Sequence, residues 1–305
     1  MRISQLCLLL AFLYTVLGSA ATYQVYYLGG QSNMDGHGYT RHLPDELKSP
    51  VKGVYIFHGN PTADGQELGG KGVWAELRPG HGAGFSSDGA KNHYSERVGV
   101  ELTLARRLKE LRPGANVALI KYSRGGTSID ERAARWFGSW EPDFTGGPRE
   151  HGGINQYDHF LATLGHAFAA RDIDGDGETD TLVPAGIVWM QGESDAAASM
   201  AIAKAYEGNL KRLMDLIRAA LRVDDLPVVI GRISDSGQDE DGKMWNHGEI
   251  VRRAQQDFVD SDPAAALVTS TDDYGYTDAA HYDTAGYIDL GRQFADALHR
   301  LNGGQ

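Results

Sequence analysis

The chain has 305 residues, of which 41% are hydrophobic, and its 29 Lys and Arg against 41 Asp and Glu give a formal net charge of −12. This balance argues against nucleic acid as a partner, because a phosphate-binding face needs clustered basic residues, and it favours neutral substrates. No repeat, low-complexity tract or long Pro/Gly/Ser linker divides the chain, so a single domain is expected.

Residues 1–20 have the pattern of a secretory signal peptide. Arg2 precedes an apolar core, LCLLLAFLYTVL, and the small residues GSAA follow at the expected cleavage point. The alternative is an uncleaved anchor helix, but the core is about a dozen residues long, whereas a membrane span needs about 20. We therefore expect a secreted or periplasmic protein, in which residues 21–305 form one domain with no membrane association after cleavage.

Cys7, the only cysteine, lies inside this signal and lacks the small residues that precede a lipidated cysteine. The mature chain is therefore expected to have no thiol chemistry and no disulfide, although it leaves the cytoplasm. Its remaining 285 residues (305 less 20) are enough to build an ordinary hydrophobic core.

Six short, continuously apolar segments are predicted to be buried strands. In chain order they are YQVYYLG (23–29), GVYIFH (53–58), NVALIKY (116–122), PAGIVWMQ (184–191), LPVVIGRI (226–233) and AALVTS (265–270). Apolar character without alternation is typical of a parallel sheet covered on both faces.

Five segments with helical periodicity are spaced among these strands. They span residues 96–111, 157–171, 201–221, 248–259 and 285–301. Because strand and helix alternate almost throughout, we predict the α/β class, with a three-layer α/β/α sandwich around a mainly parallel central sheet.

Three polar clusters follow predicted strands: GGQSN the first, SRGGTS the third and QGESD the fourth. In parallel sheets ligands bind beyond the carboxyl ends of the strands, so these clusters are expected at one edge of the sheet. Ser32 lies in the first cluster, where Gly29 and Gly30 allow a tight backbone path. Taken alone, a serine after glycine ordinarily marks only a turn or a helix cap.

A serine hydroxyl becomes a nucleophile when a base takes its proton and a third group orients that base. DAAHYDTAGY, near the C-terminus, offers Asp278 and His281, three residues apart and just before the last helix. This spacing lets the carboxylate reach one imidazole nitrogen while the other faces a pocket. An isolated D-x-x-H is common, so the pair gains weight only together with Ser32.

Acyl transfer also needs hydrogen-bond donors for the developing oxyanion. The candidates are the backbone N–H of Ser32, the backbone N–H of Gly126 in RGGTS and the side-chain amide of Gln191 in WMQGESD. Gly125 remains an alternative to Gly126. Taken alone, a Gly-Gly after a strand usually marks only a turn, and a glutamine at a strand end is usually solvated. Their location beside Ser32 favours a functional role.

Four motifs in order, GGQSNM, KYSRGGTSI, WMQGESD and DAAHYDTAGY, resemble the sialic-acid-specific acetylesterase-like branch of the SGNH hydrolases, which includes carbohydrate esterase family six. The resemblance runs from about Tyr23 to Leu298. It implies an SGNH hydrolase, flavodoxin-like fold with Ser32 as nucleophile, His281 as base and Asp278 as the residue that orients it.

The resemblance also implies an oxyanion hole made by the N–H groups of Ser32 and Gly126 and the side chain of Gln191. Many SGNH enzymes have asparagine where this branch has Gln191. Glu193 lies in the same motif and is expected to support the site by hydrogen bonding, whereas Asp195 is either such a support or a helix cap. The expected reaction is two-step acyl transfer through an acyl-serine, with no cofactor for catalysis.

DIDGDGETD, residues 172–180, resembles the front of a calcium-binding loop. The oxygen ligands at its alternate positions are expected from Asp172, Asp174, Asp176, Glu178 and Asp180, with Gly177 at a sharp turn. The twelfth position, ordinarily a bidentate Glu, is Val183, so the loop is not a complete EF-hand. We predict a structural calcium ion, the alternative being a solvated acidic loop.

The eleven histidines include no H-E-x-x-H or paired Cys/His spacing, so no catalytic zinc site is expected. His58, His81 and His93 are interpreted as packing or surface residues. The long connections 59–95 and 135–156 contain aromatic residues that can either stack on sugars or anchor the loops: Trp74, Phe85, Trp136, Phe137 and Trp140.

The leading hypothesis is a secreted carbohydrate O-acetylesterase. Its expected partner is an acetylated carbohydrate, either an acetylxylan-like polysaccharide or O-acetylated sialic acid. A lipase or thioesterase is the alternative within the enzymes, although no long apolar surface segment supports it. A non-catalytic carbohydrate-binding protein is the alternative outside them, although a binder has no need of Ser32, Asp278 and His281.

Overall fold

The structure is a computed structural model that describes residues 20–146 and 153–303. Nineteen of the twenty residues of the predicted signal, 1–19, lie outside the described part of the chain, so the signal stays a prediction. Among the described residues, no helix has the length and apolar character needed to cross a bilayer.

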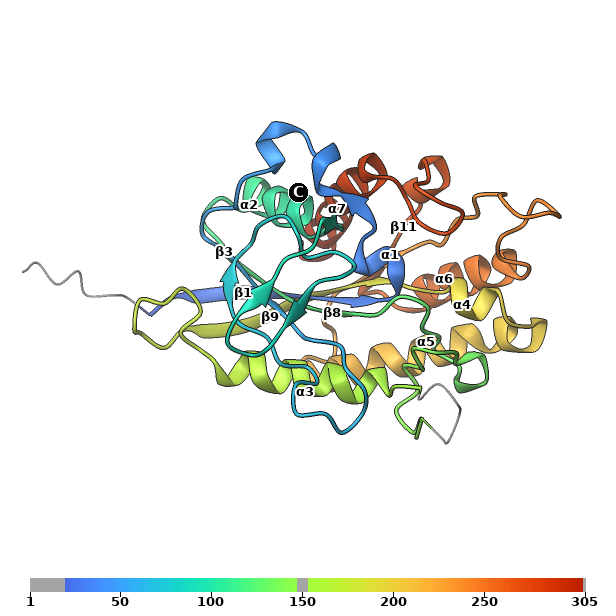
Figure 1. Ribbon diagram of the computed structural model, residues 1–305, viewed down its shortest axis with the longest axis horizontal. Helices are drawn as coiled ribbons and strands as arrows, with labels where there is room; N and C mark the ends of the chain where they lie inside the picture. Colours follow the sequence, from blue (N-terminus) through green and yellow to red (C-terminus); the bar gives the residue numbers. More distant parts are fainter. Residues whose placement is uncertain (1–19, 147–152, 304–305) are drawn as a thin grey trace, which may run out of the picture.

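A seven-stranded sheet in the order β11-β10-β9-β1-β8-β3-β4 forms the centre of the molecule (Figure 1). All neighbouring pairs are parallel except β3 and β4. The strands are β1 (Thr22–Gly30), β3 (Val54–His58), β4 (Ala75–Glu76), β8 (Asn116–Ser123), β9 (Thr181–Met190), β10 (Val228–Gly231) and β11 (Ala265–Val268). All six predicted strands are present, and the predicted fold class is confirmed.

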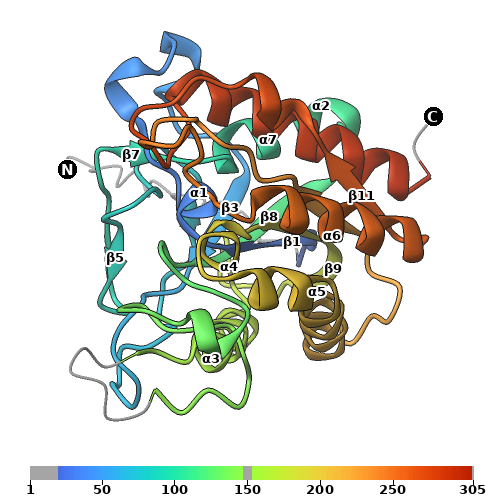
Figure 2. The same cartoon turned by 90° about the vertical axis from the view of Figure 1, so that its right-hand side faces the viewer.

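Helices cover both faces of this sheet, as Figure 2 shows along the strands. On one face lie α2 (Glu101–Leu111) and α7 (Thr284–Leu301), and on the other lie α3 (Gln156–Ala169) and α5 (Met200–Leu221), while α6 (Gly248–Ser261) packs against α5 and β11. The packing follows helical spacing: in α7, Tyr287, Leu290, Phe294 and Leu298 are all buried on the face toward the sheet.

One predicted helix begins later than its pattern indicates. The segment predicted from residue 96 is helical only from Glu101, because β7 (Arg97–Val98) pairs with β2 (Gly38–Tyr39) in a small antiparallel ladder.

The remaining short elements are the ladder of β5 (Ser86–Ser87) with β6 (Asn92–His93), the helical turns α1 (Ser32–Asp35) and α4 (Glu193–Ala196), and 3-10 turns at Thr40–His42, Asp45–Leu47, Glu131–Ala133 and Ser270–Asp273.

Candidate active site

The three polar clusters meet at one edge of the sheet, as expected. Gly30 at the end of β1 is in register with Ser123 at the end of β8 and with Met190 at the end of β9. The three central strands therefore end side by side, and the residues after them surround one place. This edge is on the right of Figure 1, where α1 follows β1.

Ser32 is the first residue of α1, directly beyond the sheet. Gly30 has φ +140, and a Cβ there would overlap the carbonyl group of Met190, so only glycine allows this close turn. Ser32 is 7% exposed and lines a cavity of about 460 Å³. Its hydroxyl has no hydrogen-bond partner among the described residues, so it faces open space.

His281 lines the same cavity and is held by Asp278. Both carboxylate oxygens of Asp278 lie 2.9 Å from His281 Nδ1, and Oδ1 also accepts the backbone N–H groups of Ala280 and His281 at 2.9 and 3.0 Å. Partial burial acts to raise the pKa of Asp278, but these hydrogen bonds outweigh it and keep that pKa below its usual value. No hydrogen bond joins Ser32 to His281 in this structure, although both face the cavity.

His37 stacks on His281 across the cavity wall. The ring centroids are 3.6 Å apart and the planes differ by 1°. Burial, followed by the neighbouring His281 and Arg97, lowers the pKa of His37 to about 4, so this imidazole is neutral at pH 7. His37, Asp278 and His281 offer ligand atoms within 4.8 Å of one another, but the nitrogen lone pairs of two parallel rings cannot converge on one ion.

The structure separates Gly125 from Gly126 as oxyanion donors. The N–H of Gly125 donates to Asp35 Oδ2 at 2.8 Å, and Ser123 Oγ donates to Asp35 Oδ1 at 2.6 Å. The N–H of Gly126 has no hydrogen-bond partner in the described chain, nor does that of Ser32, and both residues line the cavity. Of the two glycines, Gly126 therefore has the free donor.

The expected role of Gln191 in the oxyanion hole is wrong for this geometry. Its side chain is fully buried and does not line the cavity. Its Nε2 donates to Thr127 O (3.1 Å), Asp195 Oδ2 (2.7 Å) and Gln31 Oε1 (3.2 Å), and its Oε1 accepts from the hydroxyl of Tyr206 (2.9 Å). Because every polar atom of this amide is already bonded, it has no donor left for an oxyanion.

Glu193 contacts the site through Asn33, the residue after Ser32. Asn33 Nδ2 donates to Glu193 Oε1 at 2.8 Å and to the carbonyl oxygen of Ala280 at 3.1 Å. Asn33 Oδ1 accepts the N–H of Tyr282 at 3.3 Å. Asn33 thus binds the chain on both sides of His281. Burial raises the pKa of Glu193 to about 7.

Asp195 does not cap a helix. Its two oxygens accept the N–H groups of Ile129 and Asp130, both at 3.0 Å, in addition to the Gln191 amide. Burial raises the pKa of Asp195 to about 6. This side chain therefore fixes the loop that continues from Gly126.

Two arginines without acidic partners also line the cavity. Neither Arg124 nor Arg135 forms a side-chain hydrogen bond or ion pair with a described residue. The Arg124 guanidinium lies 4.2 Å from the ring centroid of Phe137, and its Nε is buried without a partner. Trp245, half-buried, forms another part of the wall. The cavity therefore combines two arginines that form no ion pair, the carboxylate of Asp35 and aromatic surface.

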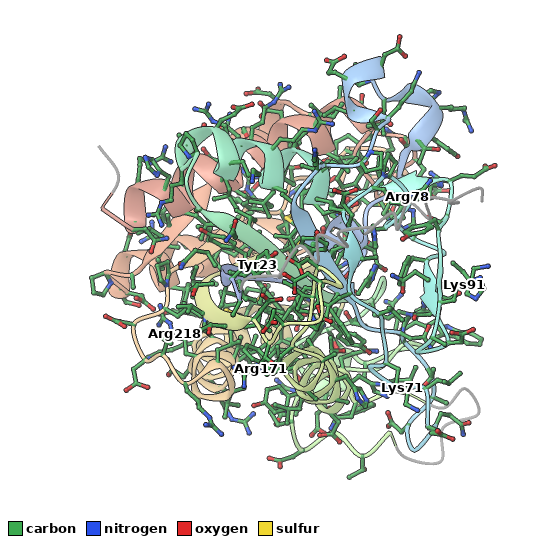
Figure 3. All side chains as sticks on the ribbon, turned by 90° about the vertical axis from the view of Figure 1, so that its left-hand side faces the viewer. Tyr23, Lys71, Arg78, Lys91, Arg171 and Arg218 are labelled. Carbon is green, nitrogen blue, oxygen red and sulfur yellow. The ribbon has the colours of Figure 1, made fainter. Side chains whose placement is uncertain are left out.

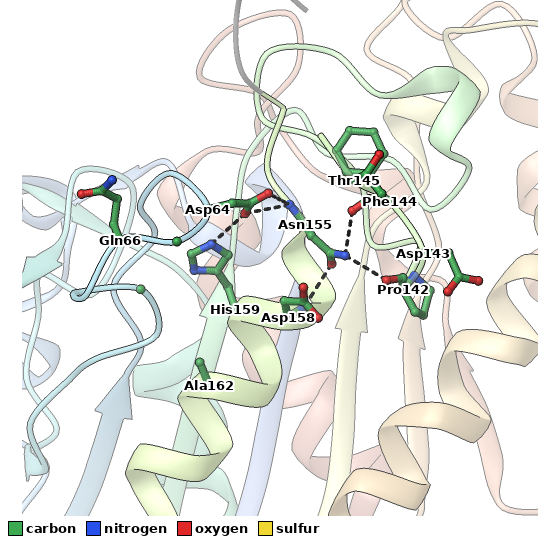
Figure 4. Close-up of a pocket in the computed structure, with 12 residues that line it drawn as sticks. Asp64, Gln66, Pro142, Asp143, Phe144, Thr145, Asn155, Asp158, His159 and Ala162 are labelled. Atoms are coloured by element: carbon green, nitrogen blue, oxygen red, sulfur yellow. Dashed lines mark hydrogen bonds and ion pairs between the residues drawn. The ribbon is translucent and has the colours of Figure 1, made fainter. Parts of the chain in front are cut away.

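A second cavity, of about 550 Å³, lies at the start of α3 and contains neither Ser32 nor His281 (Figure 4). Its polar groups are paired with one another: the Asp64 carboxylate accepts the N–H of Asn155 at 3.1 Å and pairs with His159 Nε2 at 3.1 Å. These contacts tie the loop after β3 to α3. The smaller cavity, which contains the predicted nucleophile and base, is the candidate active site.

The acidic loop lies at the opposite end of the sheet, where β1 begins. Figure 3 views this end, with Tyr23 and Arg171 labelled. The Tyr23 hydroxyl donates to Asp174 Oδ2 at 3.1 Å, and the nine-residue β1 puts Ser32 about 30 Å away.

Not all five expected calcium ligands fit. Asp172, Asp174 and Asp176 offer oxygens within 4.8 Å of one another. Asp180 is fully buried, and its two oxygens accept the N–H groups of Ala21 and Ile173 at 3.0 Å, so it anchors the loop instead. Glu178 lies outside the group of three. The expected ligand set is thus reduced to Asp172, Asp174 and Asp176.

The other singled-out side chains are mostly structural. His58 and His81 are buried and contact each other through Nδ1 at 3.3 Å, whereas His93 is exposed. Phe85 and Trp140 are buried and Trp74 packs on the core. Of the five aromatic residues singled out in the long connections, only Phe137 lines the candidate active site.

Comparison with known proteins identifies the family. The profile described as "carbohydrate esterase, sialic acid-specific acetylesterase" matches residues 22–300. The chain belongs to this family. Membership makes it an ester hydrolase of carbohydrates at the level of the family, and it confirms the resemblance on the four motifs.

Solved structures show the same fold. A protein from Arabidopsis thaliana is 22% identical with a TM-score of 0.62, over 92% of this chain and 98% of that one. A carbohydrate acetylesterase from Xanthomonas citri is 18% identical with a TM-score of 0.63, over 92% of this chain and 57% of that one. NanS is 15% identical with a TM-score of 0.60, over 94% of this chain and 99% of that one. A search of curated protein sequences found no match.

Sequence reasoning missed several residues of the candidate active site. Gln31 and Asn33 flank Ser32 within the quoted motif, and His37 follows five residues after Ser32. Their signal was proximity to Ser32, the predicted nucleophile, in a loop with no apolar pattern. Arg124 could have been noticed as a lone cation in a glycine-rich turn after a strand, but its lack of a partner needs the structure.

Proposed function

We propose that this protein is a secreted carbohydrate O-acetylesterase that uses Ser32, His281 and Asp278 as its catalytic triad. One observation carries the proposal: Ser32 and the Asp278-bound His281 line the same cavity, next to the unbonded N–H groups of Ser32 and Gly126. A free hydroxyl, an oriented base and two free donors are the parts that acyl transfer needs.

In the proposed reaction His281 Nε2 takes the proton of Ser32 as Oγ attacks the acetyl carbonyl carbon. The N–H groups of Ser32 and Gly126 stabilise the oxyanion. Asp278 holds the protonated imidazole, which then gives its proton to the leaving sugar oxygen. Water, deprotonated by His281, attacks the acetyl-serine and releases acetate. Since no hydrogen bond joins Ser32 and His281 here, we expect that contact to form when substrate binds.

The charge of the cavity bears on the choice of sugar. Arg124 and Arg135 form no ion pair with a described residue, in a protein with a formal net charge of −12. A sugar carboxylate would supply the missing partner, and arginine binds carboxylates through paired hydrogen bonds. These arginines therefore favour an acetylated acidic sugar, a sialate or a uronate, over neutral xylan, and Trp245 offers a face for a sugar ring.

The acidic loop is proposed as a structural calcium site formed by Asp172, Asp174 and Asp176. Three carboxylates this close repel one another, and hard oxygen ligands suit calcium. Its place about 30 Å from Ser32, at the far end of β1, gives the ion no part in catalysis.

The deciding experiment measures acetate release by the mature protein, residues 21–305, with Ser32→Ala in parallel. The substrates are acetylated xylan, O-acetylated sialoside and acetylated pectin, with a triglyceride and an acyl thioester for the two alternative enzyme classes. Release from a sugar ester that vanishes in Ser32→Ala supports the proposal. Release from the triglyceride or thioester alone would favour the alternative enzymes, and sugar binding without any hydrolysis would favour the non-catalytic binder.

The arginines are tested on the same panel. Arg124→Gln and Arg135→Gln should raise KM roughly tenfold or more for the acidic ester and leave KM for acetylated xylan nearly unchanged, because a charge-assisted hydrogen bond contributes about 1.5–3 kcal/mol. An equal rise in KM for both substrates would contradict the carboxylate assignment.

A further inference from the structure

We propose that a cavity next to the candidate active site binds the neighbouring sugar of a glycan, so that the substrate is an acetylated sugar joined to a neutral sugar rather than a free monosaccharide. The inference rests on the proposed esterase function and narrows its substrate class. The cavity has a volume of about 280 Å³ and is formed by residues between Ile233 and Arg252, which follow β10.

This cavity shares a wall with the candidate active site. Trp245 lines both cavities, so a single residue separates them. Both lie beyond the carboxyl ends of neighbouring parallel strands, because β10 pairs with β9 and residues 232–247 follow β10. Ligands of parallel sheets bind at this edge. A glycan whose acetyl group reaches Ser32 can therefore extend past Trp245 into the second cavity.

Trp245 is fixed at both its backbone and its ring. Its backbone N–H donates to Asp235 Oδ2 at 2.8 Å, and its indole Nε1 donates to the carbonyl oxygen of Ser234 at 3.1 Å. Because the polar atom of the ring is already bonded, the half-buried indole can contact a ligand only through its apolar surface. The negative face of an aromatic ring suits the C–H groups of a sugar ring.

The loop that carries Trp245 is closed at its base and attached to the segment of the predicted base. The Asp235 carboxylate accepts three backbone N–H groups at 2.8 to 2.9 Å, those of Gly237, Met244 and Trp245. Ser236 Oγ donates to the carbonyl oxygen of Ala279 at 2.7 Å, two residues before His281. The second cavity is therefore held in place relative to His281 without a ligand, as is usual for binding sites.

The polar side chains around this cavity indicate what it can bind. Arg252 is already paired with Asp272, at 2.7 and 3.0 Å. Three exposed side chains of the cavity form no hydrogen bond or ion pair with a described residue: Lys243, Asn246 and Glu249. They offer a cationic donor, an amide that donates and accepts, and an anionic acceptor. Because the two charges balance, the set suits the hydroxyl groups of a neutral sugar better than a second acidic sugar.

The competing interpretation is a gap beneath an exposed loop that binds nothing. The two interpretations differ in how the kinetics depend on substrate length. Contacts to a remote part of the substrate raise kcat/KM only for substrates that reach them. A gap without a ligand gives the same kcat/KM for one sugar and for two.

The experiment compares matched acetyl esters of one and two sugars. One pair is the methyl glycoside of O-acetylated sialic acid and the same sialic acid linked to galactose, and the other is acetylated methyl xyloside and acetylated xylobiose. In the pair that is hydrolysed, we expect kcat/KM to be about tenfold higher for the two-sugar ester, the gain from one or two added hydrogen bonds. Replacing the galactose by galacturonate should remove the gain, and a larger gain with galacturonate would overturn the neutral assignment.

Asn246→Ala tests the second cavity directly, because Asn246 does not line the candidate active site. For the two-sugar ester we expect KM to rise about three- to tenfold. The one-sugar ester should show no such rise, since no part of it reaches Asn246. Gln238→Ala is the matched control: Gln238 is an exposed residue of the same loop and lines neither cavity, so both esters should keep their kinetics.

Equal kcat/KM for the one-sugar and two-sugar esters, or an equal rise in KM for both in Asn246→Ala, would overturn the inference and leave the esterase function intact. If no ester is hydrolysed, the proposed function fails. Calorimetric titration of wild type and Asn246→Ala with unacetylated sialyl-galactose and xylobiose then decides the second cavity separately. Binding that Asn246→Ala weakens would support a sugar site there, and absent or unaltered binding would overturn it.

Discussion

Glu193→Gln should stabilise the protein at alkaline pH. Burial raises the pKa of Glu193 from 4.5 to about 7, and a shift of that size corresponds to about 3 kcal/mol at 1.36 kcal/mol per pKa unit. Since the folded state binds this proton more tightly, the stability it contributes is fully present below pH 4.5 and is lost as the pH rises through 7. Glutamine never ionises and avoids that loss.

The substitution leaves the surrounding contacts intact. Glu193 Oε1 accepts from Asn33 Nδ2, and glutamine retains an oxygen there. Glu193 Oε2 is buried with no hydrogen-bond partner among the described residues, so the new NH₂ group replaces no existing bond. The substitution therefore removes the charge and adds an amide donor with no acceptor among the described residues, and the cost of that donor is the same at every pH.

The assay is thermal unfolding of wild type and Glu193→Gln from pH 4.5 to 8.5. Wild type and variant must be compared because other buried groups also make stability depend on pH. Burial lowers the pKa values of His37, His58 and His81, so these histidines stabilise the fold above pH 6.5 and lose that effect as the pH falls, which is opposite to the effect of Glu193. We expect the Tm difference to grow by roughly 6 °C across this range, at about 2 °C per kcal/mol. A Tm difference that is the same at every pH would refute the reasoning.

Three further predictions follow from the contacts. Asp278→Asn should lower kcat by about 10³- to 10⁴-fold, because the amide cannot stabilise the His281 imidazolium; kcat within tenfold of wild type would remove Asp278 from the triad. Asn33→Ala should lower kcat, because it frees the chain around His281, and should reduce the unfolding free energy by about 1–3 kcal/mol, because it leaves buried groups unsatisfied. If kcat and the unfolding free energy both stay unchanged, Asn33 does not support the His281 segment. Calcium added to chelator-treated protein should raise Tm, and the rise should vanish in Asp174→Asn; equal rises in both proteins would exclude this loop.

The fold and the location of the candidate site could be predicted because they depend on strong, local signals. Each continuous apolar run is a buried parallel strand, and parallel strands that neighbour one another end at the same edge. Ser32 and His281 lie far apart in sequence but both follow elements that end there. The two-residue β4 and the late start of α2 have no such signal, since they depend on pairing with distant backbone.

Which side-chain and backbone donors are free at the site could not be predicted in this way. Gln31 and Gln191 both follow central strands, both are buried, and they differ only in which of their amide atoms already have partners. The same holds for Gly125 and Gly126, which differ by one hydrogen bond to Asp35. Motif order places a residue near a site, whereas its donor capacity depends on contacts from other segments.

The buried carboxyl of Glu193 has a reason to persist despite its effect on stability. Asn33 bonds to Glu193 and also to Ala280 and Tyr282, so the residue after Ser32 holds the segment that carries His281. With an apolar side chain at 193 the Asn33 NH₂ group would keep only the Ala280 carbonyl as an acceptor, while Asn33 Oδ1 would stay bonded to the Tyr282 N–H and the Tyr287 hydroxyl. The carboxyl thus lowers stability by about 3 kcal/mol above pH 7 and helps to hold the residue after Ser32 against the segment that carries His281, as the proposed proton transfer requires.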